Sequence, residues 1–444
     1  MRRAPHSPAW TCGKNRHNRH HNPRQHQRGV ASLIIVMVLF FILSMVAAYT
    51  NRNLIFEQRT SANQYRSTQA IEAAEAGLEW ATALLNSGRI DAVCAASADI
   101  TDTTFRQRYL AIDAASGVVS RLTQAGGAEL QPTCVRDGNA WRCSCPADGA
   151  PVLDPPAVVG VFPAFRVRFL AVSTTQPGIV RIEATGCTRL DDTCLVFPAR
   201  AAAGDAGTTL SVLVALQSGV AMPPVAALTV RGNLNVGGAA LGAFNEDPAS
   251  AITLRAGGNV SRPGLVLGSA AGTPVEQSYI ANDSELADVN FNANRMFAAV
   301  FGMWPSTYPE QPAAVVLACP LGGCTAAIVR DAATANPGRV LWAPGDLVFD
   351  SAGDVGSAAE PVVVVATGSI RFTDPSVTVY GLLYSRAGPW TTAGGGTVVG
   401  AAVAENDLVG SGTTAFVYNA AVLETLRLQT GSFVRVPGSW KDFP

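Results

Sequence analysis

The sequence predicts an α+β protein with a long N-terminal helix, a small mixed α/β region and a β-rich C-terminal region. Three observations support this prediction. The run from Val30 to Tyr49 carries no formal charge. The residues that follow contain neither Pro nor Gly until Gly77. Toward the C-terminus, short Val-, Ala- and Leu-rich segments alternate with Gly and Asn, as in strands joined by tight turns.

Residues 30–49 are predicted to cross a membrane. At 1.5 Å per residue a helix of this length covers roughly 30 Å, the thickness of a bilayer core. The apolar part of a secretory signal peptide is shorter, about 7–15 residues. Residues 1–29 hold six Arg, one Lys and no acidic residue, and such a basic flank stays on the cytoplasmic side. We therefore expect a single pass with the C-terminal bulk translocated across the membrane.

The helix is expected to continue to about Asn86. Residues 50–87 are amphipathic, because apolar side chains recur near helical spacing and Asn86-Ser87-Gly88 supplies a stop. The alternative is a plain signal anchor followed by a separate juxtamembrane helix.

Two strings in this helix, "QRGVASLIIVMVLFFILSMVA" and "QAIEAAEAGLEWA", resemble the N-terminus of PilX-type minor pilins of the type IV pilin and pseudopilin superfamily. The resemblance covers about Gln27–Leu85. It implies that residues 1–29 are a class III leader, which a prepilin peptidase cuts between Gly29 and Val30 before methylating the Val30 amine. It also implies that the apolar run first anchors the protein in the inner membrane and later lies in a filament core, with a sheet packed on the distal half of the helix.

The fifth residue after this junction is Ile34, where most pilins carry a Glu that pairs with the N-terminal amine of a neighbouring subunit. A charge buried without a partner costs free energy, and such a pair relieves that cost for both groups. A subunit with Ile34 cannot offer this contact to a neighbour. We therefore expect it at the end of a filament, in the tip or initiating complex, rather than along the shaft.

Composition argues against enzymatic activity, and we expect no cofactor. All five His lie within residues 1–29, so the processed chain lacks the His of Ser-His-Asp and Cys-His catalysis and of His-ligated zinc. Removal of the seven basic residues of the leader also changes the net charge from -1 to -8, which excludes a general affinity for nucleic acid.

Eight Cys follow the leader, an even number that favours disulfides in an oxidising compartment. Local spacing suggests Cys187–Cys194 and Cys319–Cys324. The pairing of the remaining four stays open: Cys94, Cys134, Cys143 and Cys145. The alternative for Cys143 and Cys145 is a metal site.

Residues 88–222 are expected to form the mixed, disulfide-containing region. Residues 165–172 and 178–186 alternate as two antiparallel strands, and "TTLSVLVALQSG" is a third. Residues 223–444 contain a 19-residue spacing between Val379, Val398 and Val417. Such a repeat predicts a parallel β-solenoid, with an antiparallel sandwich as the alternative. A helical insertion is expected near 284–302.

Two groups of acidic residues in this β-rich region are candidate sites. Asp346, Asp350 and Asp354 are spaced by four residues, which is not the spacing of an EF-hand loop. Solvated turn carboxylates are favoured over a calcium site. Glu405 and Asp407 lie close in sequence, and a carboxylate pair can cleave polysaccharide, although turn residues explain them equally.

The sequence thus predicts a minor pilin-like subunit of a type IV pilus that promotes pilus assembly, with adhesion through the C-terminal β region. Its expected partners are other minor and major pilins, prepilin peptidase, the inner membrane and a surface or glycan ligand. Two alternatives remain at this stage: a type II secretion pseudopilin, and a membrane-tethered protein that binds or cleaves polysaccharide.

Overall fold

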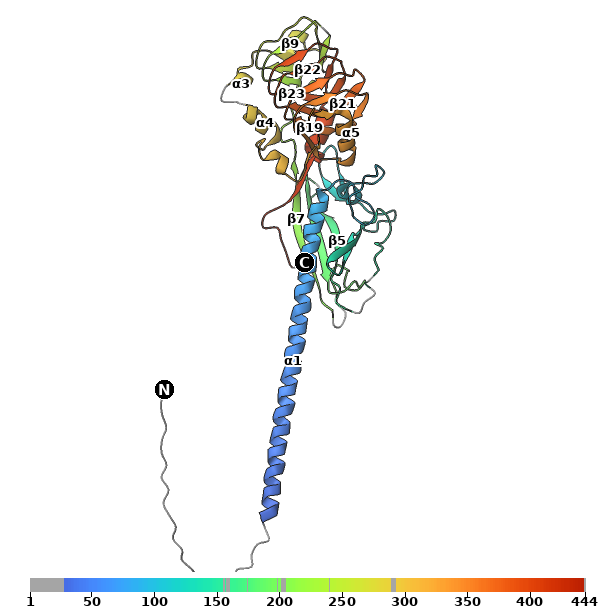
Figure 1. Ribbon diagram of the computed structural model, residues 1–444, viewed down its shortest axis with the longest axis vertical. Coiled ribbons are helices and arrows are strands. Elements are labelled where there is room, and N and C mark those ends of the chain that lie inside the picture. Colours follow the sequence, from blue (N-terminus) through green and yellow to red (C-terminus); the bar gives the residue numbers. More distant parts are fainter. Residues whose placement is uncertain are drawn as a thin grey trace, which may run out of the picture. The chain divides into compact units, whose positions relative to one another are not determined.

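The computed structural model describes residues 28–442, except 155, 157–159, 174, 198, 201–204, 239 and 289–292. The chain divides into two compact units, Met1–Gln64 and Tyr65–Pro444. Helix α1 spans Arg28–Leu85 and supplies all the described residues of the first unit (Figure 1). Everything below on packing concerns the second unit.

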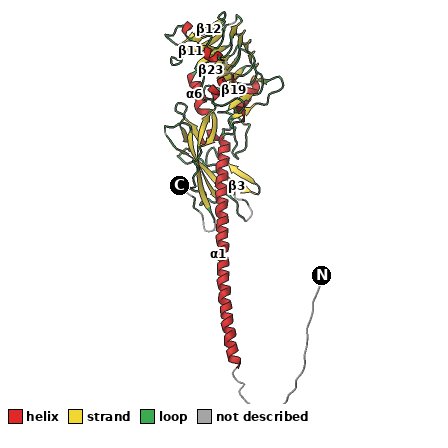
Figure 2. Cartoon of the chain, turned by 90° about the vertical axis from the view of Figure 1, so that its left-hand side faces the viewer, coloured by secondary structure: helices red, strands yellow, loops and turns green. Residues whose placement is uncertain are grey.

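A six-stranded antiparallel sheet lies beside the C-terminal part of α1 (Figure 2). Its strands, in spatial order, are β26 (Gly431–Arg435), β7 (Gly207–Ser218), β6 (Ile179–Cys187), β5 (Ala164–Ala171), β3 (Thr133–Asp137) and β4 (Ala140–Ser144). The three strands expected from alternation correspond to β5, β6 and β7, which pair antiparallel in chain order.

Strand β26 differs from expectation. The sequence groups it with the β-rich region, whereas it pairs antiparallel with β7 and completes the sheet beside α1. Pairing between strands so far apart in the chain leaves no local signal, because each strand alternates in the same way whichever partner it has.

Next to this sheet, Thr104 and Gln107 form a capping box that starts helix α2, Phe105–Tyr109. The two-stranded ladder of β1 (Leu110–Ile112) and β2 (Val119–Arg121) follows it.

The β-rich region consists of parallel sheets, which confirms this part of the predicted fold class. The smaller sheet orders β15 (Cys324–Thr325), β17 (Leu347–Phe349), β20 (Ile370–Phe372), β22 (Trp390–Thr392), β24 (Leu408–Gly410) and β9 (Leu234–Val236). The twelve-stranded sheet contains β8 (Ala226–Val230), β10 (Leu241–Asn245), β11 (Ile252–Ala256), β12 (Leu265–Ser269), β13 (Tyr279–Ile280), β14 (Ala314–Val316), β16 (Val340–Ala343), β18 (Gly353–Val355), β19 (Val362–Ala366), β21 (Val377–Ser385), β23 (Thr397–Ala404) and β25 (Ala415–Tyr418).

Glycines are required where the long strands β21 and β23 bend. Gly381 and Gly400 pair with each other in register and have φ values of +143° and +138°. A Cβ at Gly381 would lie 1.8 Å from the carbonyl oxygen of Val362 on the neighbouring strand. Only glycine tolerates both the backbone conformation and this close approach.

The 19-residue spacing holds for one step of the stack and then changes. Val379 pairs with Val398, as the spacing predicts, but Val398 then pairs with Phe416 rather than with Val417. Strand β23 also pairs with β8, the first strand of the region. The chain therefore enters the stack in its middle, at β8, and adds strands toward one end as far as β13. It then returns, and the strands from β14 to β25 fill the other half.

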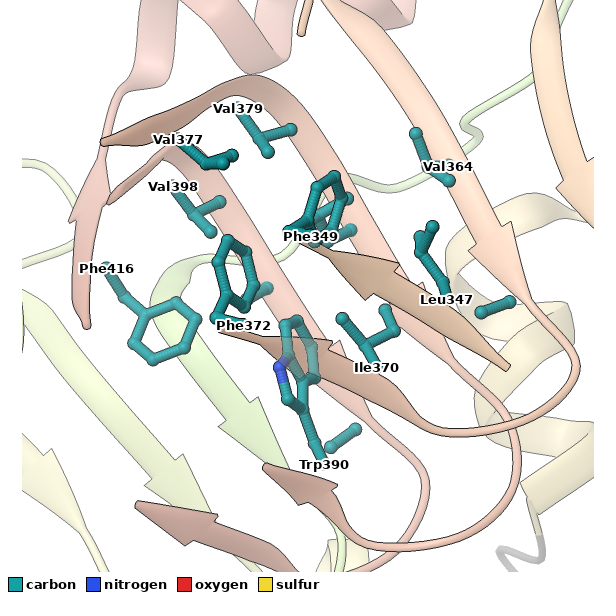
Figure 3. Close-up of a cluster of buried hydrophobic side chains, with 14 of the residues drawn as sticks. Leu347, Phe349, Val364, Ile370, Phe372, Val377, Val379, Trp390, Val398 and Phe416 are labelled. Carbon is teal, nitrogen blue, oxygen red and sulfur yellow. The ribbon is translucent and has the colours of Figure 1, made fainter. Parts of the chain in front are cut away.

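Buried aromatic side chains connect successive strands of the smaller sheet (Figure 3). Phe349 stacks on Phe372 with ring centroids 4.6 Å apart, and Phe372 stacks on Trp390 at 6.4 Å. All three are fully buried. Because aromatic side chains bury large apolar areas and favour stacked or edge-to-face contacts, this row forms the centre of the β-rich core.

Helices cover parts of the β-rich region. The single helix expected near 284–302 is instead two helices, α3 (Ser284–Ala287) and α4 (Ala293–Phe301), and residues 289–292 between them are outside the described part. Asp283 caps α3 by accepting a hydrogen bond from the Glu285 amide. The remaining helices are α5 (Ala326–Ala335), α6 (Ala420–Gln429), and the 3₁₀ turns η1 (Val275–Gln277) and η2 (Tyr308–Glu310).

Candidate functional site: the N-terminal helix and its contacts with the sheet

The predicted processing junction lies at the start of α1. Residues 1–27 are outside the described part of the chain, and Gly29 and Val30 belong to the helical backbone that begins at Arg28. The helix contains an apolar window with a mean hydropathy of 2.7, so it is long and apolar enough to cross a membrane.

The apolar side chains of this segment are exposed rather than packed against the rest of the described chain. Ile34 is 55% exposed and Phe40 is 72% exposed. Large apolar surface of this extent marks a membrane or protein interface. Ile34 presents no carboxylate on this surface, so this position offers only dispersion and hydrophobic contacts.

Beyond Tyr65 the helix turns one face of small and apolar residues toward the antiparallel sheet. The buried positions recur at spacings of three and four, as expected for one side of a helix: Ala70, Ala73, Ala74, Leu78, Ala81 and Leu85. The string "AAEAGL" lies within this face. Its small residues allow close approach, since a Cβ built at Gly77 would already lie 3.0 Å from the ring of Phe165.

Aromatic rings and an ion pair hold the end of this face in place. Trp80 contacts Phe105 edge-on and Phe165 at a tilt, both with centroids 5.4 Å apart. Glu79 of α1 pairs with Arg435 of β26 at 2.6 Å. The C-terminal strand therefore contacts the helix as well as the sheet.

Asn86 ends the helix by bonding to the C-terminal strand. Its side-chain amide donates to the Phe433 carbonyl oxygen at 2.9 Å and accepts from the Phe433 amide at 2.7 Å. The sequence predicts Asn86 as a helix stop, but its partner is decided by the fold.

Arg106 is a central residue that sequence reasoning missed. Its guanidinium is buried and donates to the carbonyl oxygens of Leu85 at 3.0 Å and Gly431 at 3.0 Å, and more weakly to those of Gly338 and Gln429. Burial, with a contribution from the charge of Arg339, lowers the pKa of Arg106 to about 10, so it remains charged near neutral pH. Leu85 is the last residue of α1, where a cation is favoured by the helix dipole.

Residues 28–79 match the PilX N-terminal family model. The match falls within Gln27–Leu85 and confirms the PilX resemblance for this segment. No match was found among curated proteins. Among solved structures, the competence-associated pilin ComZ from Thermus thermophilus aligns over 85% of this chain and 97% of its own, with 11% identity and a TM-score of 0.20. A TM-score of this size does not establish a common fold.

The distal half of the PilX-like helix thus packs on the mixed region that follows it in the chain. In the part of the chain that the structure describes, the disulfides are Cys94–Cys145, Cys134–Cys143, Cys187–Cys194 and Cys319–Cys324. The first three lie in the mixed region, where Cys134 and Cys143 bridge the facing strands β3 and β4.

The three aspartates of the possible calcium site do not form a cluster. Asp346 accepts a hydrogen bond from the Ser369 amide at 2.8 Å and lies 3.6 Å from Arg371, whereas Asp350 accepts from the Ala326 amide. Asp354 is exposed. Among the described residues, no group of three or more His, Cys, Asp or Glu side chains could hold a metal ion.

Glu405 and Asp407 also serve separate roles. Asp407 accepts a hydrogen bond from the Asn233 amide at 2.6 Å, and Asn233 in turn accepts from the Asn259 amide, so these side chains link neighbouring turns. Glu405 is 1% exposed and pairs with Arg386 at 3.2 Å. A buried, ion-paired carboxylate beside a turn-linking carboxylate does not form the open pair that glycoside cleavage needs.

Proposed function

We propose that this protein is a minor pilin-like subunit that enters a type IV pilus through α1. The observation that carries the proposal is the PilX match over residues 28–79. In this part of α1 an exposed apolar stretch is followed by a face that packs on the antiparallel sheet. A structural subunit needs an anchor before assembly and an interface afterwards. The apolar part of α1 suits both, because lipid tails and neighbouring apolar helices each bury it.

Prepilin peptidase is the processing enzyme in this proposal, cutting between Gly29 and Val30 and methylating Val30. The basic residues before the junction favour retention of the leader in the cytoplasm, with the rest of the chain in the periplasm. The disulfides fit this placement, because they persist in an oxidising compartment.

A tip or initiating position is supported by two features. Ile34 lacks the carboxylate that would pair with a neighbour's amine. In addition, the segment that follows α1 contacts the β-rich region. Arg89 donates to the Thr334 carbonyl oxygen at 2.7 Å, and Arg106, which also donates to Leu85 at the end of α1, reaches Gly338. In a filament of parallel helices, this end is where a further subunit would stack. The added region, which we interpret as a β-solenoid, would occupy that space and could carry adhesion.

Mass spectrometry of the protein isolated from membranes tests the processing step. We expect an N-terminus at methylated Val30, and the substitution Gly29→Val should leave the leader attached. Purified filaments should contain the processed protein in few copies, and deletion of its gene should reduce filament number. An intact leader in the wild-type chain, or unchanged filaments after deletion, would contradict the proposal.

A further inference from the structure

Two adjoining pockets open where the mixed region meets the β-rich region. Their volumes are about 340 Å³ and about 190 Å³. Both are lined by Pro337 and Gly338 after α5, and by Glu360 and Pro361 before β19. We call the two pockets together the junction cleft. Ligand sites occur preferentially at such boundaries between substructures, and the larger pocket lies in their usual size range.

Four arginines line the junction cleft: Arg89, Arg106, Arg330 and Arg339. Within the described ranges of the chain, none of them lies within ion-pair distance of a carboxylate. Their hydrogen bonds go to uncharged oxygens instead. Arg330, for example, donates to the carbonyl oxygens of Ser351 and Ala352 at 3.2 and 3.0 Å. Four guanidiniums against the two lining carboxylates, Asp354 and Glu360, leave the cleft with a net positive charge. A recess of this kind attracts anions, and its low-dielectric walls strengthen the field.

Two of these guanidiniums also keep a donor unused. The Nε atoms of Arg330 and Arg339 are buried and have no hydrogen-bond partner. Because these atoms are buried, they do not face a ligand in the cleft, and the attraction for an anion rests on the charge of the guanidiniums.

The remaining lining narrows the class of anion. Asp354 and Glu360 are exposed carboxylates at the cleft, and Glu360 accepts from the Gln107 side chain at 2.8 Å. They can accept hydrogen bonds from the hydroxyl groups of a ligand. The larger pocket adds an apolar wall that includes Leu110, Ile112 and Leu122. A ligand with separated carboxylates, many hydroxyls and an apolar C–H face fits all three features.

We propose that the junction cleft binds a carboxylated oligosaccharide of the uronic-acid type. Guanidinium groups bind carboxylates in charge-assisted, often bidentate hydrogen bonds, while Asp354 and Glu360 take the sugar hydroxyls. This inference specifies the ligand class for the adhesive role in the proposed function. It does not require filament entry, so failure of the processing or filament experiments would leave it standing.

The test is calorimetric titration of the full chain in detergent micelles with tetragalacturonate. The fully methyl-esterified tetramer is the matched ligand control, because it keeps the sugar rings but removes the charges. We expect the ester to bind at least about tenfold more weakly, since a charge-assisted bond is worth about 1.5–3 kcal/mol.

The variant Arg330→Gln should weaken tetragalacturonate binding by about tenfold, and Arg330→Lys should give an intermediate loss because it keeps charge without the planar fork. Arg262→Gln is the control, an exposed arginine on the loop before β12 that pairs with Glu276. It should leave affinity unchanged. Circular dichroism of each variant checks folding, and Arg330→Lys covers the case in which the Gln variant fails to fold.

Three results would overturn the proposal: no binding of tetragalacturonate, equal binding of the ester, or equal affinity in Arg330→Gln and wild type. Competition by inorganic phosphate or a single-stranded oligonucleotide at similar concentrations would also overturn it. That result would identify general attraction of anions rather than sugar recognition.

Discussion

Gly186 of β6 lies directly against Ala70 of α1: a Cβ built at Gly186 would be 2.2 Å from the Ala70 carbonyl oxygen and 2.3 Å from the Ala74 amide nitrogen. The helix can therefore approach the sheet only because one strand residue has no side chain. This contact explains why small residues cluster in the "AAEAGL" part of the helix, since larger side chains there would not fit between the helix and the sheet.

Substitution Gly186→Ala should lower the free energy of unfolding of the second unit by about 1–3 kcal/mol, because overpacking forces backbone shifts. Urea denaturation followed by tryptophan fluorescence measures this loss. Gly322→Ala is the control, because a Cβ there meets nothing within 4 Å, and it should stay near wild type. An unchanged midpoint for Gly186→Ala would show that helix and sheet are less closely packed than described.

Arg106→Met should destabilise the junction between α1, β26 and the β-rich region. The variant keeps an apolar stem but leaves the carbonyl oxygens of Leu85 and Gly431 without their donor, at a cost of about 3 kcal/mol. Limited proteolysis should then cut the chain between residues 325 and 345 faster. Arg371→Met, half-exposed on β20, should have little effect, and equal sensitivity of the two variants would argue against a special role for Arg106.

Glu405 should make stability depend on pH. Burial raises its pKa from 4.5 to about 7, against the opposing effect of Arg386. Between these two values the folded protein binds the proton more tightly than the unfolded chain. Stability is therefore fully present below about pH 4.5, falls as pH rises, and levels off above about pH 7, with a total change on the order of 3 kcal/mol.

Thermal melts between pH 4.5 and 8 check this prediction. The variant Glu405→Gln should remove most of the slope, because an amide does not titrate. Asp354→Asn, at an exposed carboxylate, should keep the wild-type slope. A slope that is the same in wild type and Glu405→Gln would assign the pH dependence to another group.

Removal of Cys94–Cys145 by double Ser substitution should cost about 4 kcal/mol, whereas removal of Cys187–Cys194 should cost about 2 kcal/mol. The sequence separations are 51 and 7 residues, and the entropy of the unfolded chain is restricted more by the longer loop. Denaturant midpoints of the two double variants give the comparison. The reverse order would mean that native contacts rather than chain entropy dominate.

Ile34→Glu should change where the protein lies in filaments. A carboxylate at this position could pair with a neighbour's amine, so we expect immunogold labelling to extend along the shaft instead of remaining at the ends. Ile35→Glu places the same charge on an adjacent position, where we expect it to reduce incorporation, because a buried unpaired charge is costly. Identical labelling for wild type and Ile34→Glu would contradict the role assigned to position 34.

Much of the candidate site is readable in the sequence because its signals are local. The apolar run, the PilX-like strings and the spacing of β5, β6 and β7 each depend on residues close together in the chain. Arg106 carried no such signal. An arginine in a short helix is expected at the surface, and only the convergence of four carbonyl groups from other segments makes Arg106 a buried junction residue.

The amino-acid order alone determined that the N-terminal part of this protein contains a long helix with an apolar first part, and that strands follow it. Periodicity encodes these properties within each segment. Tertiary structure alone decided that β26 returns to the first sheet, that β23 meets β8, and that Asn86 bonds to Phe433. These pairings join residues more than 170 positions apart, and the free energy that selects them comes from surfaces that exist only after the segments have folded.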